Sequence, residues 1–502
     1  MSSFANMLEK SQYSKYSPVS AHSSDDGFED DEKAGGANFR RPRRLRRQGS
    51  DMLHYVKVRS RQRFLVTVAC IVATVFGLLA ILVHTESLPE IKASLSELPA
   101  VSNFQALSQY AFGQEDLLLP PSALSRKVRV AVIETGGYHD EVVGAWIHAF
   151  GGHPNVELEL VLDKQRFGIT DIEADFQLGN PLPANYTYWF GWLEHDYDIP
   201  DIIVSTTCHW DSKQLESQYA KLLATGRTYM FCGVHMADYW STYPQLQERM
   251  KPWVEKGLID FLTLSPHVTD FLKNQSLSTW NATVEPVVRT MVPVYPVVLP
   301  DSASDDPEDL SFALQGNYEP SRRDYDTIFK HMESFLAPAS PEADSATPSA
   351  NVTLHLIGSG EKPSVPDALV DRVLFDENLS YHDFYSILSR TFALLPAFAS
   401  DDYLVSKGSS TVNAALIAGT PLVATRKMLE QYSFLDESVV WVQEDGETEL
   451  EVVSRVVKMD RAEVQEKKAN VKAFTQGLVT GNRELAAEWM RTALAKVEAA
   501  KS

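Results

Sequence analysis

Cysteine is nearly absent from this sequence, with three residues in 502. Cys70 lies in a long apolar run, and Cys208 and Cys232 fall at the ends of two strands that we expect to be neighbours, so they permit one disulfide bond. The alternative is that both are small buried side chains. No cysteine or histidine spacing is that of a zinc site, so the sequence predicts no metal site.

Positive charge is also short. The chain has 46 Lys and Arg against 67 Asp and Glu, a formal net charge of −21. Residues 1–63 hold 13 basic and 8 acidic side chains, a net +5, so the rest of the chain carries −26. A body that binds nucleic acid needs a basic surface, and this deficit therefore excludes nucleic acid as its partner.

One apolar run is long enough to cross a membrane. Residues 64–83, FLVTVACIVATVFGLLAILV, contain no charged side chain and would form a helix about 30 Å long. A signal peptide would start nearer the N-terminus, and a buried core helix would have a polar face. Arginines and lysines precede the run, whereas Glu86 and Glu90 follow it, which places the N-terminus in the cytoplasm. We expect a single-pass type II protein whose span of about twenty residues suits the Golgi or endoplasmic reticulum membrane.

The two sides of this transmembrane segment differ as the predicted topology requires. Residues 1–63 are rich in Ser, Arg and Asp, which predicts a disordered cytoplasmic tail. Its basic run is either a stop-transfer flank or a site for anionic lipid headgroups. All five Asn-x-Ser/Thr sequons follow the segment, which predicts lumenal glycosylation at Asn185, Asn274, Asn281, Asn351 and Asn378.

The lumenal part alternates strand and helix patterns. Residues 84–126 are punctuated by Leu, Ser and Pro and are interpreted as a stem. Near-continuous apolar runs such as VRVAVIE and TYMFCGV recur with helical segments between them in residues 127–300. After a Pro-punctuated crossing segment the pattern restarts in residues 301–480, and residues 481–502 form an amphipathic helix. These patterns predict an α/β fold with two Rossmann-like domains of parallel strands facing a cleft.

Polar side chains at strand ends are the first candidates for a site, because ligands of such sheets bind at the carboxyl ends of the strands. Four histidines follow predicted strands of the first domain: His139, His209, His235 and His267. Histidine is the commonest acid or base in catalysis, so at least one of them is a functional candidate.

The second domain resembles the nucleotide-sugar domain of GT-B glycosyltransferases, especially the large retaining group often called family 4. The resemblance rests on LHLIGSGE, then RVLFDENLSYHDFYSILSRTFALLPAF, then SKGSSTVNAALIAGTPLVAT. It covers roughly the second half of the lumenal chain, and the first domain resembles the family only in architecture. It implies a nucleotide diphosphate sugar as donor substrate, no cofactor and no obligatory metal.

The same resemblance suggests a donor site. The helix opened by Gly408, Ser409, Ser410 and Thr411 would hold the diphosphate on its backbone N–H groups, although simple capping by the serines is the alternative. In QGNYEPSRRDYD, Arg322 and Arg323 would begin a second helix and supply positive charge, unless they are solvated surface residues. Gly358 and Gly360 would form a tight turn beneath the nucleotide, and Gly316 is a further candidate donor-binding residue. The third glycine of the dinucleotide fingerprint is missing.

The family's two glutamates, eight residues apart, are also missing. Their positions hold Ser406 and Ala414, and alanine cannot bind the ribose hydroxyls. Asn413 could substitute only if the helix is slightly rotated. Donor binding is therefore altered or lost.

The catalytic candidates lie in the first domain. In IETGGYHDEVV a glycine turn presents His139, with Glu134 and Asp140 nearby. The alternative is a helix-capping Asp140 beside a surface His139.

The sequence therefore predicts a type II membrane glycosyltransferase that transfers a sugar to a glycan, lipid or protein acceptor in the secretory pathway. The alternative is a catalytically inactive GT-B-like protein that binds a glycan or a partner, which the missing glutamates motivate. A nucleotide-sugar epimerase of the same fold is a third interpretation.

Overall fold

The structure is a computed structural model that describes residues 126–176, 178, 192–193, 199–299, 310–337 and 352–501. The predicted tail, apolar run and nearly all of the stem lie outside these residues, as do Asn185 and Asn351. Within the described ranges, no helix combines the length and the apolar character needed to cross a membrane.

The first sheet is built from residues 128–290 and contains six parallel strands in the order β2-β1-β3-β4-β5-β6. Its central strands are buried on both faces, which explains their near-continuous apolar sequences. The elements of this first half are β1 (Val128–Glu134), α4 (Asp140–Gly151), β2 (Val156–Leu162), α5 (Ile169–Ala174), β3 (Ile202–Ser205), α6 (Cys208–Gln214), α7 (Glu216–Thr225), β4 (Tyr229–Val234), α8 (Tyr239–Thr242), α9 (Pro244–Glu255), β5 (Ile259–Thr263), α10 (Pro266–Phe271), the short turns Leu272–Ser276 and Leu277–Trp280, and β6 (Val287–Thr290).

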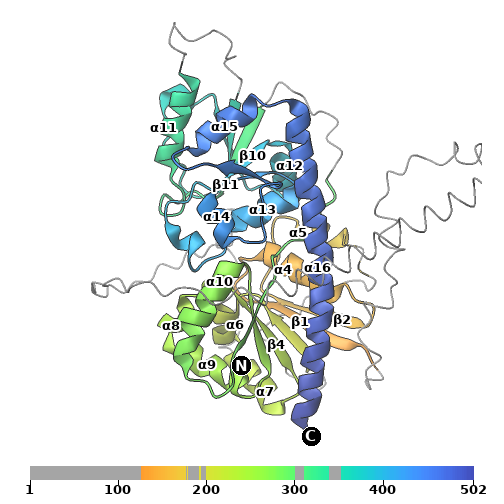
Figure 1. Cartoon of the computed structure of the whole chain (residues 1–502). Coiled ribbons are helices and arrows are strands. Elements are labelled where there is room, and N and C mark those ends of the chain that lie inside the picture. The colour runs from red at the N-terminus through yellow and green to blue at the C-terminus, as the bar shows by residue number, and fades with distance from the viewer. Residues whose placement is uncertain are drawn as a thin grey trace, which may run out of the picture. The chain divides into compact units, whose positions relative to one another are not determined.

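The second sheet also has six parallel strands, in the order β12-β11-β10-β7-β8-β9. Helices α11 and α15 pack against each other, as do α12 and α13 (Figure 1). The elements of this second half are β7 (Leu310–Asn317), α11 (Tyr325–Leu336), β8 (Val352–Ser359), a turn at Asp367–Leu369, β9 (Val373–Glu377), α12 (Tyr381–Arg390), β10 (Ala393–Leu395), a turn at Asp401–Leu404, α13 (Ser410–Ala418), β11 (Leu422–Thr425), α14 (Arg426–Gln431), β12 (Val440–Gln443) and α15 (Glu449–Val457).

These two parallel sheets confirm the α/β class and the two Rossmann-like domains expected from the sequence. Strand order reverses between β1 and β3 in the first sheet, and between β7 and β10 in the second. Ligands of open parallel sheets bind outside the carboxyl ends of the strands at such points. The residues at and after the carboxyl ends of these four strands are therefore the candidates for a ligand site.

The C-terminal helix differs from the prediction. We expected a helix at residues 481–502, but α16 runs from Arg461 to Lys501, because its sequence holds no proline over these 41 residues. Lys468 donates to the carbonyls of Ser389 and Thr391 in the second half, and Asn482 donates to the carbonyl of Val292 in the first. A single helix, drawn in dark blue in Figure 1, thus contacts both halves.

Three further local predictions differ from the structure in part. The crossing segment VEPVVRTMVPVYPVVLP contains a sixth strand, β6, which pairs with β5 between the prolines that would interrupt the ladder. The arginines at 322 and 323 precede α11 and do not begin it, because Asp324 caps that helix by accepting from the Thr327 amide. The strand expected in FALLPAF is confined to Ala393–Leu395, since proline follows it.

Candidate functional site

Glycines at the carboxyl ends of β7 and β8 allow these strands to approach closely: Gly316 and Gly358 are paired in the ladder, and Gly360 directly follows β8. Gly316 has φ +135° and Gly360 has φ +114°, values that side chains rarely adopt. A Cβ on Gly358 would lie 1.9 Å from the carbonyl oxygen of Gly316. The Gly-x-Gly pattern therefore has a backbone reason at this edge of the second sheet.

Arg323 is buried at the point where β7 and β10 separate. Its side chain is among the largest that are fully buried, with the residue 1% exposed. Nη2 donates to the Gln315 carbonyl at 3.0 Å and to Thr411 Oγ1 at 2.8 Å, and Nε donates to the same carbonyl at 3.2 Å. The rings of Phe398 and Tyr403 lie 5.5 and 5.7 Å from the guanidinium carbon. Arg323 therefore joins the end of β7 to the first turn of α13.

No carboxylate of the described chain forms an ion pair with Arg323. Glu449, which accepts from the Ala397 amide at 3.0 Å, interacts with it at longer range. Burial raises the pKa of Glu449 to about 7, so this carboxyl compensates the arginine only in part at neutral pH. A buried cation without a paired anion is costly.

Arg322 is less deeply buried, with 11% of its side chain exposed. Its Nε donates to the hydroxyl of Tyr403 at 3.1 Å, and Nη1 lies 3.7 Å from the carboxylate of Glu319. Because Glu319 is 42% exposed, this ion pair is weak. Both arginines are therefore largely buried, which rules out the alternative that they are solvated surface residues.

The first turn of α13 satisfies part of its own hydrogen bonding. Ser409 is the N-cap, and its hydroxyl accepts from the Thr411 amide at 3.3 Å. The Ser409 amide donates to the hydroxyl of Tyr432 at 3.1 Å. Serine capping therefore accounts for one amide group at this end of the helix, and Tyr432 accounts for a second.

Two serine hydroxyls near this turn are left over. Ser410 Oγ and Ser265 Oγ are buried, and neither has a hydrogen-bond partner among the residues that the structure describes. A Cβ built on Gly408 would lie 3.7 Å from Ser265 Oγ and 3.4 Å from the Leu264 Cβ. Gly408 thus faces the loop between β5 and α10 of the first half. Buried hydroxyls normally have partners, so a ligand with acceptor oxygens would suit this place.

The positions of the family's two glutamates take part in packing instead. The Ser406 carbonyl accepts from the Ala237 amide at 2.9 Å, which joins the two halves. Ala414 and Asn413 are both buried in α13, at 5% and 6% exposure. The structure offers no carboxylate at either described position to replace the missing pair.

The corresponding edge of the first sheet carries a buried polar cluster. Glu134, the last residue of β1, accepts from the amides of Gly136 and Gly137, which belong to the glycine turn. His139 Nδ1 lies 4.0 Å from Glu134 Oε1 and 2.9 Å from Thr207 Oγ1. Glu134 and His139 are 2% and 1% exposed, so His139 is not a surface residue. Two of the three predicted catalytic residues are therefore brought together.

Asp140 lies apart from this pair in its polar contacts. It is the first residue of α4, and neither it nor His139 caps the helix with a side-chain bond. Its carboxylate accepts from the Arg166 amide at 3.2 Å and lies 3.7 Å from Arg166 Nε. Burial raises the pKa of Asp140 to about 7, although Arg166 opposes the shift.

Three buried polar residues at these two sites were not predicted from the sequence: Asp211, Thr207 and Gln315. Asp211 accepts four hydrogen bonds: from the amide and hydroxyl of Thr135, the Ser205 hydroxyl and the Thr207 amide. Burial raises the pKa of Asp211, and these donors oppose the shift. Thr207 follows β3 as closely as the histidines follow their strands. The strand-end criterion would have found it if it had been applied to all polar residues.

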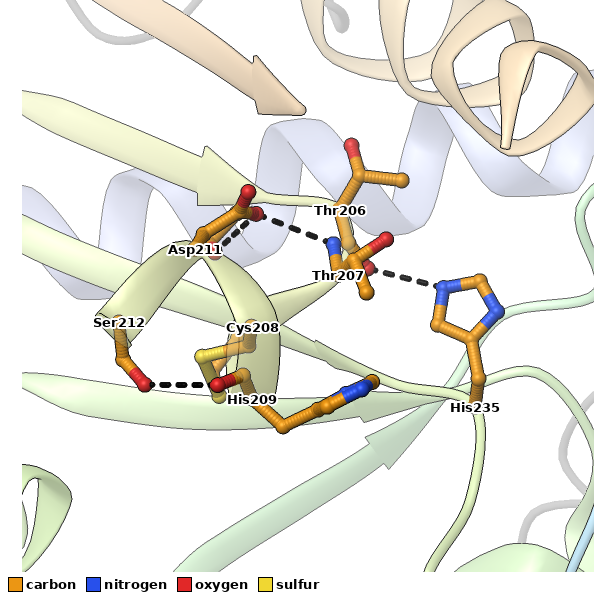
Figure 2. The surroundings of a disulfide bond; sticks show 9 residues. Thr206, Thr207, Cys208, His209, Asp211, Ser212 and His235 are labelled. Carbon is orange, nitrogen blue, oxygen red and sulfur yellow. Dashed lines mark hydrogen bonds between the residues drawn. A yellow bond between two sulfur atoms is a disulfide. The ribbon is translucent and has the colours of Figure 1, made fainter. Parts of the chain in front are cut away.

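Cys208 and Cys232 form a disulfide with their Cα atoms 5.3 Å apart, within the range used to predict it (Figure 2). As expected, β3 and β4 are neighbours, but Cys208 is the first residue of α6 and does not belong to β3. Both cysteines are fully buried.

Each of the other strand-end histidines has a partner of its own, and the ring of His235 also lies with its centroid 4.0 Å from that of His139. His235 Nε2 donates to the Thr206 carbonyl at 2.9 Å (Figure 2), and burial lowers its pKa. His267 Nε2 donates to the Lys407 carbonyl at 2.9 Å and thereby joins the two halves. His209 packs edge-on against Tyr239.

The three described sequon asparagines, Asn274, Asn281 and Asn378, are all exposed.

In the described part of the chain, no three His, Cys, Asp or Glu side chains are grouped as ligands of a metal ion. A pocket of about 570 Å³ opens beside α11, α14 and α15, and its lining includes none of the predicted donor residues.

No protein-family model matches the chain, and no curated protein matches it. Solved structures resemble it at a distance. HepE from Anabaena in complex with UDP-glucose is 13% identical, with 72% of this chain and 99% of that chain covered and a TM-score of 0.48. A mutant O-GlcNAc transferase from Thermobaculum terrenum is 13% identical, with 75% and 69% covered and a TM-score of 0.43. A UDP-N-acetylglucosamine 2-epimerase is 12% identical, with 68% and 91% covered and a TM-score of 0.39. At these identities and TM-scores, none of the three tells what this chain binds or catalyses.

Proposed function

We propose that the chain is a glycosyltransferase that uses a nucleotide diphosphate sugar and acts on a glycan, lipid or protein acceptor in the lumen of the secretory pathway. The observation that carries this proposal is the surroundings of the first turn of α13. There the buried, incompletely compensated Arg323 contacts Thr411, and the neighbouring Ser410 hydroxyl has no partner in the described chain. A diphosphate would supply both the negative charge and the acceptor oxygens that these groups require.

The transfer forms a bond between an acceptor hydroxyl oxygen and the anomeric carbon of the sugar. The bond from that carbon to the diphosphate breaks, and its electron pair leaves with the nucleotide diphosphate. Arg322 and the Ser410 hydroxyl would stabilise the developing charge, with Arg323 behind them. The hydroxyl proton passes to a base, for which Glu134 and His139 are the candidates, or to the departing diphosphate.

Calorimetric titration with nucleotide diphosphates tests the donor site. The full chain, purified in detergent, is titrated with UDP, GDP, ADP and CDP, and its hydrolysis of a panel of nucleotide sugars is then measured. We expect one diphosphate to bind and Arg322→Ala to weaken that binding about tenfold, because one charge-assisted contact is worth roughly 1.5–3 kcal/mol.

Arg426→Ala is the matched control. Arg426 belongs to the same half and pairs with Glu437 and Glu444 on the surface, so its removal changes the net charge equally without touching the site. Absence of heat with every nucleotide, or equal affinities of the parent and Arg322→Ala, would refute the donor site.

A protein that binds a nucleotide or glycan without transfer is the second candidate. Ser406 and Ala414, which stand where the family has glutamates, favour it. Nucleotide binding without turnover of any sugar in the panel, with glycan acceptors present, would support this candidate over the transferase.

A further inference from the structure

Two separate chain segments contact the imidazole of His139. One is the loop after β3, where Thr207 Oγ1 lies 2.9 Å from Nδ1. The other is the loop after β4, where the ring of His235 lies with its centroid 4.0 Å from that of His139. Because an imidazole acts as an acid or base only in a defined orientation, these two loops decide how His139 is presented.

The same two loops are bonded to each other. Cys208, which directly follows Thr207, forms the disulfide with Cys232, which lies three residues before His235. A hydrogen bond from His235 Nε2 to the Thr206 carbonyl joins them again, and both links appear in Figure 2. Asp211 fixes the Thr207 backbone by accepting from its amide at 3.1 Å.

We propose that the Cys208–Cys232 disulfide positions the imidazole of His139, acting through Thr207 and His235. Thr207 and His235 are then positioning residues. A covalent link between the loops restricts their relative motion, so it preserves both the distance from Thr207 to His139 and the tilted ring contact of His235 with His139. The chemical role of His139 rests on the proposed function, whereas its positioning can be tested without any activity.

Other groups also face His139 and stay in place in the test. Glu134 approaches from β1 at 4.0 Å, and Asp140 is the next residue of its own chain segment. Asp211 lies behind Thr207. None of these is changed in the variants below, so a change at His139 reports on the two bonded loops.

Chemical modification of histidine measures the positioning directly. The full chain is treated with diethyl pyrocarbonate, which reacts with accessible neutral imidazoles, and the rate at each histidine is followed by mass spectrometry. In the double variant Cys208→Ala/Cys232→Ala and in Thr207→Val, we expect the rate at His139 to rise about fivefold or more, as loss of one hydrogen bond of ordinary strength implies. Thr207→Ser keeps the hydroxyl and should keep the parent rate.

Two controls separate positioning from general loosening. His355, paired with Asp376 at 2.7 Å in the second half, should react at the same rate in every variant. Val453→Ala removes buried apolar volume from α15 and should lower stability without changing the rate at His139.

Equal His139 rates in the parent, the folded double variant and Thr207→Val would overturn the proposal. If the double variant fails to fold, equal rates in Thr207→Val and the parent overturn it still. Where transfer activity is found, Thr207→Val should lower kcat with the KM for the nucleotide sugar unchanged, and Thr207→Ser should restore kcat. A chain that shows no transfer would refute the proposed function, while the modification rates would still decide the positioning.

Discussion

Mutation of Arg322 and mutation of Arg323 should affect different properties of the protein. Arg323 donates three hydrogen bonds of 3.2 Å or less to Gln315 and Thr411 from a fully buried position. Arg322 donates to Tyr403 and forms a weak ion pair with the exposed Glu319. Arg323→Ala should therefore affect stability first, and Arg322→Ala should affect nucleotide binding first.

The expected magnitudes follow from these contacts. Hydrogen bonds to a charged group are worth about 1.5–3 kcal/mol each, and part of this is offset because the unpaired charge is removed as well. Arg323→Ala should lower the free energy of unfolding by roughly 3–5 kcal/mol, since it leaves two buried acceptors unsatisfied and a cavity. Arg322→Ala should lower it by about 1 kcal/mol or less, and should weaken nucleotide affinity about tenfold.

Urea denaturation followed by circular dichroism measures the first quantity, and calorimetric titration with the preferred nucleotide measures the second. Arg323→Lys keeps the charge without the planar fork and should recover only part of the stability. Unfolding of Arg323→Ala at the same urea concentration as the parent would contradict the structural role of Arg323. A loss of stability in Arg322→Ala as large as that in Arg323→Ala would contradict the different roles of the two arginines.

Three further predictions concern the rest of the chain. Endoglycosidase treatment of the native protein should lower its apparent mass, because the described sequon asparagines Asn274, Asn281 and Asn378 are exposed; an unchanged mass would contradict a lumenal location. Burial raises the pKa of Glu173 to about 8, so the folded state binds this proton more tightly than the unfolded state. The resulting contribution to the free energy of unfolding is present below pH 4, and roughly 2–4 kcal/mol of it is lost as the pH rises towards 8. Glu173→Gln cannot ionise and should not show this loss between pH 4 and pH 9 in urea titrations. Gly477 lies inside α16, and a methyl group added to its Cα would meet no atom within 4 Å. Gly477→Ala should therefore raise the free energy of unfolding by about 0.5–1 kcal/mol, which a higher melting temperature would show. A lower melting temperature would show that this part of the helix does not tolerate the methyl group.

The sequence alone determined the class of the fold. Buried parallel strands such as Val128–Glu134 need apolar side chains on both faces, and helices need a polar face, so both patterns are written locally. The capping serine and the closing Gly419, with φ +70°, likewise marked the ends of α13. The disulfide could be proposed from the sequence because neighbouring strands bring their ends within bonding distance.

Only the tertiary structure decided which polar groups meet. Arg323 and Thr411 are 88 residues apart, His139 and Thr207 are 68 apart, and His267 and the Lys407 carbonyl are 140 apart. No local pattern encodes such pairs, because they depend on strand order and on where each strand stops. Strand order placed the ends of β1 and β3 together, and those of β7 and β10. The carboxylate of Asp140 instead contacts Arg166. The same packing determined how deeply each side chain is buried. Arg323, which is fully buried, has a structural role, whereas the less buried Arg322 is a candidate ligand contact.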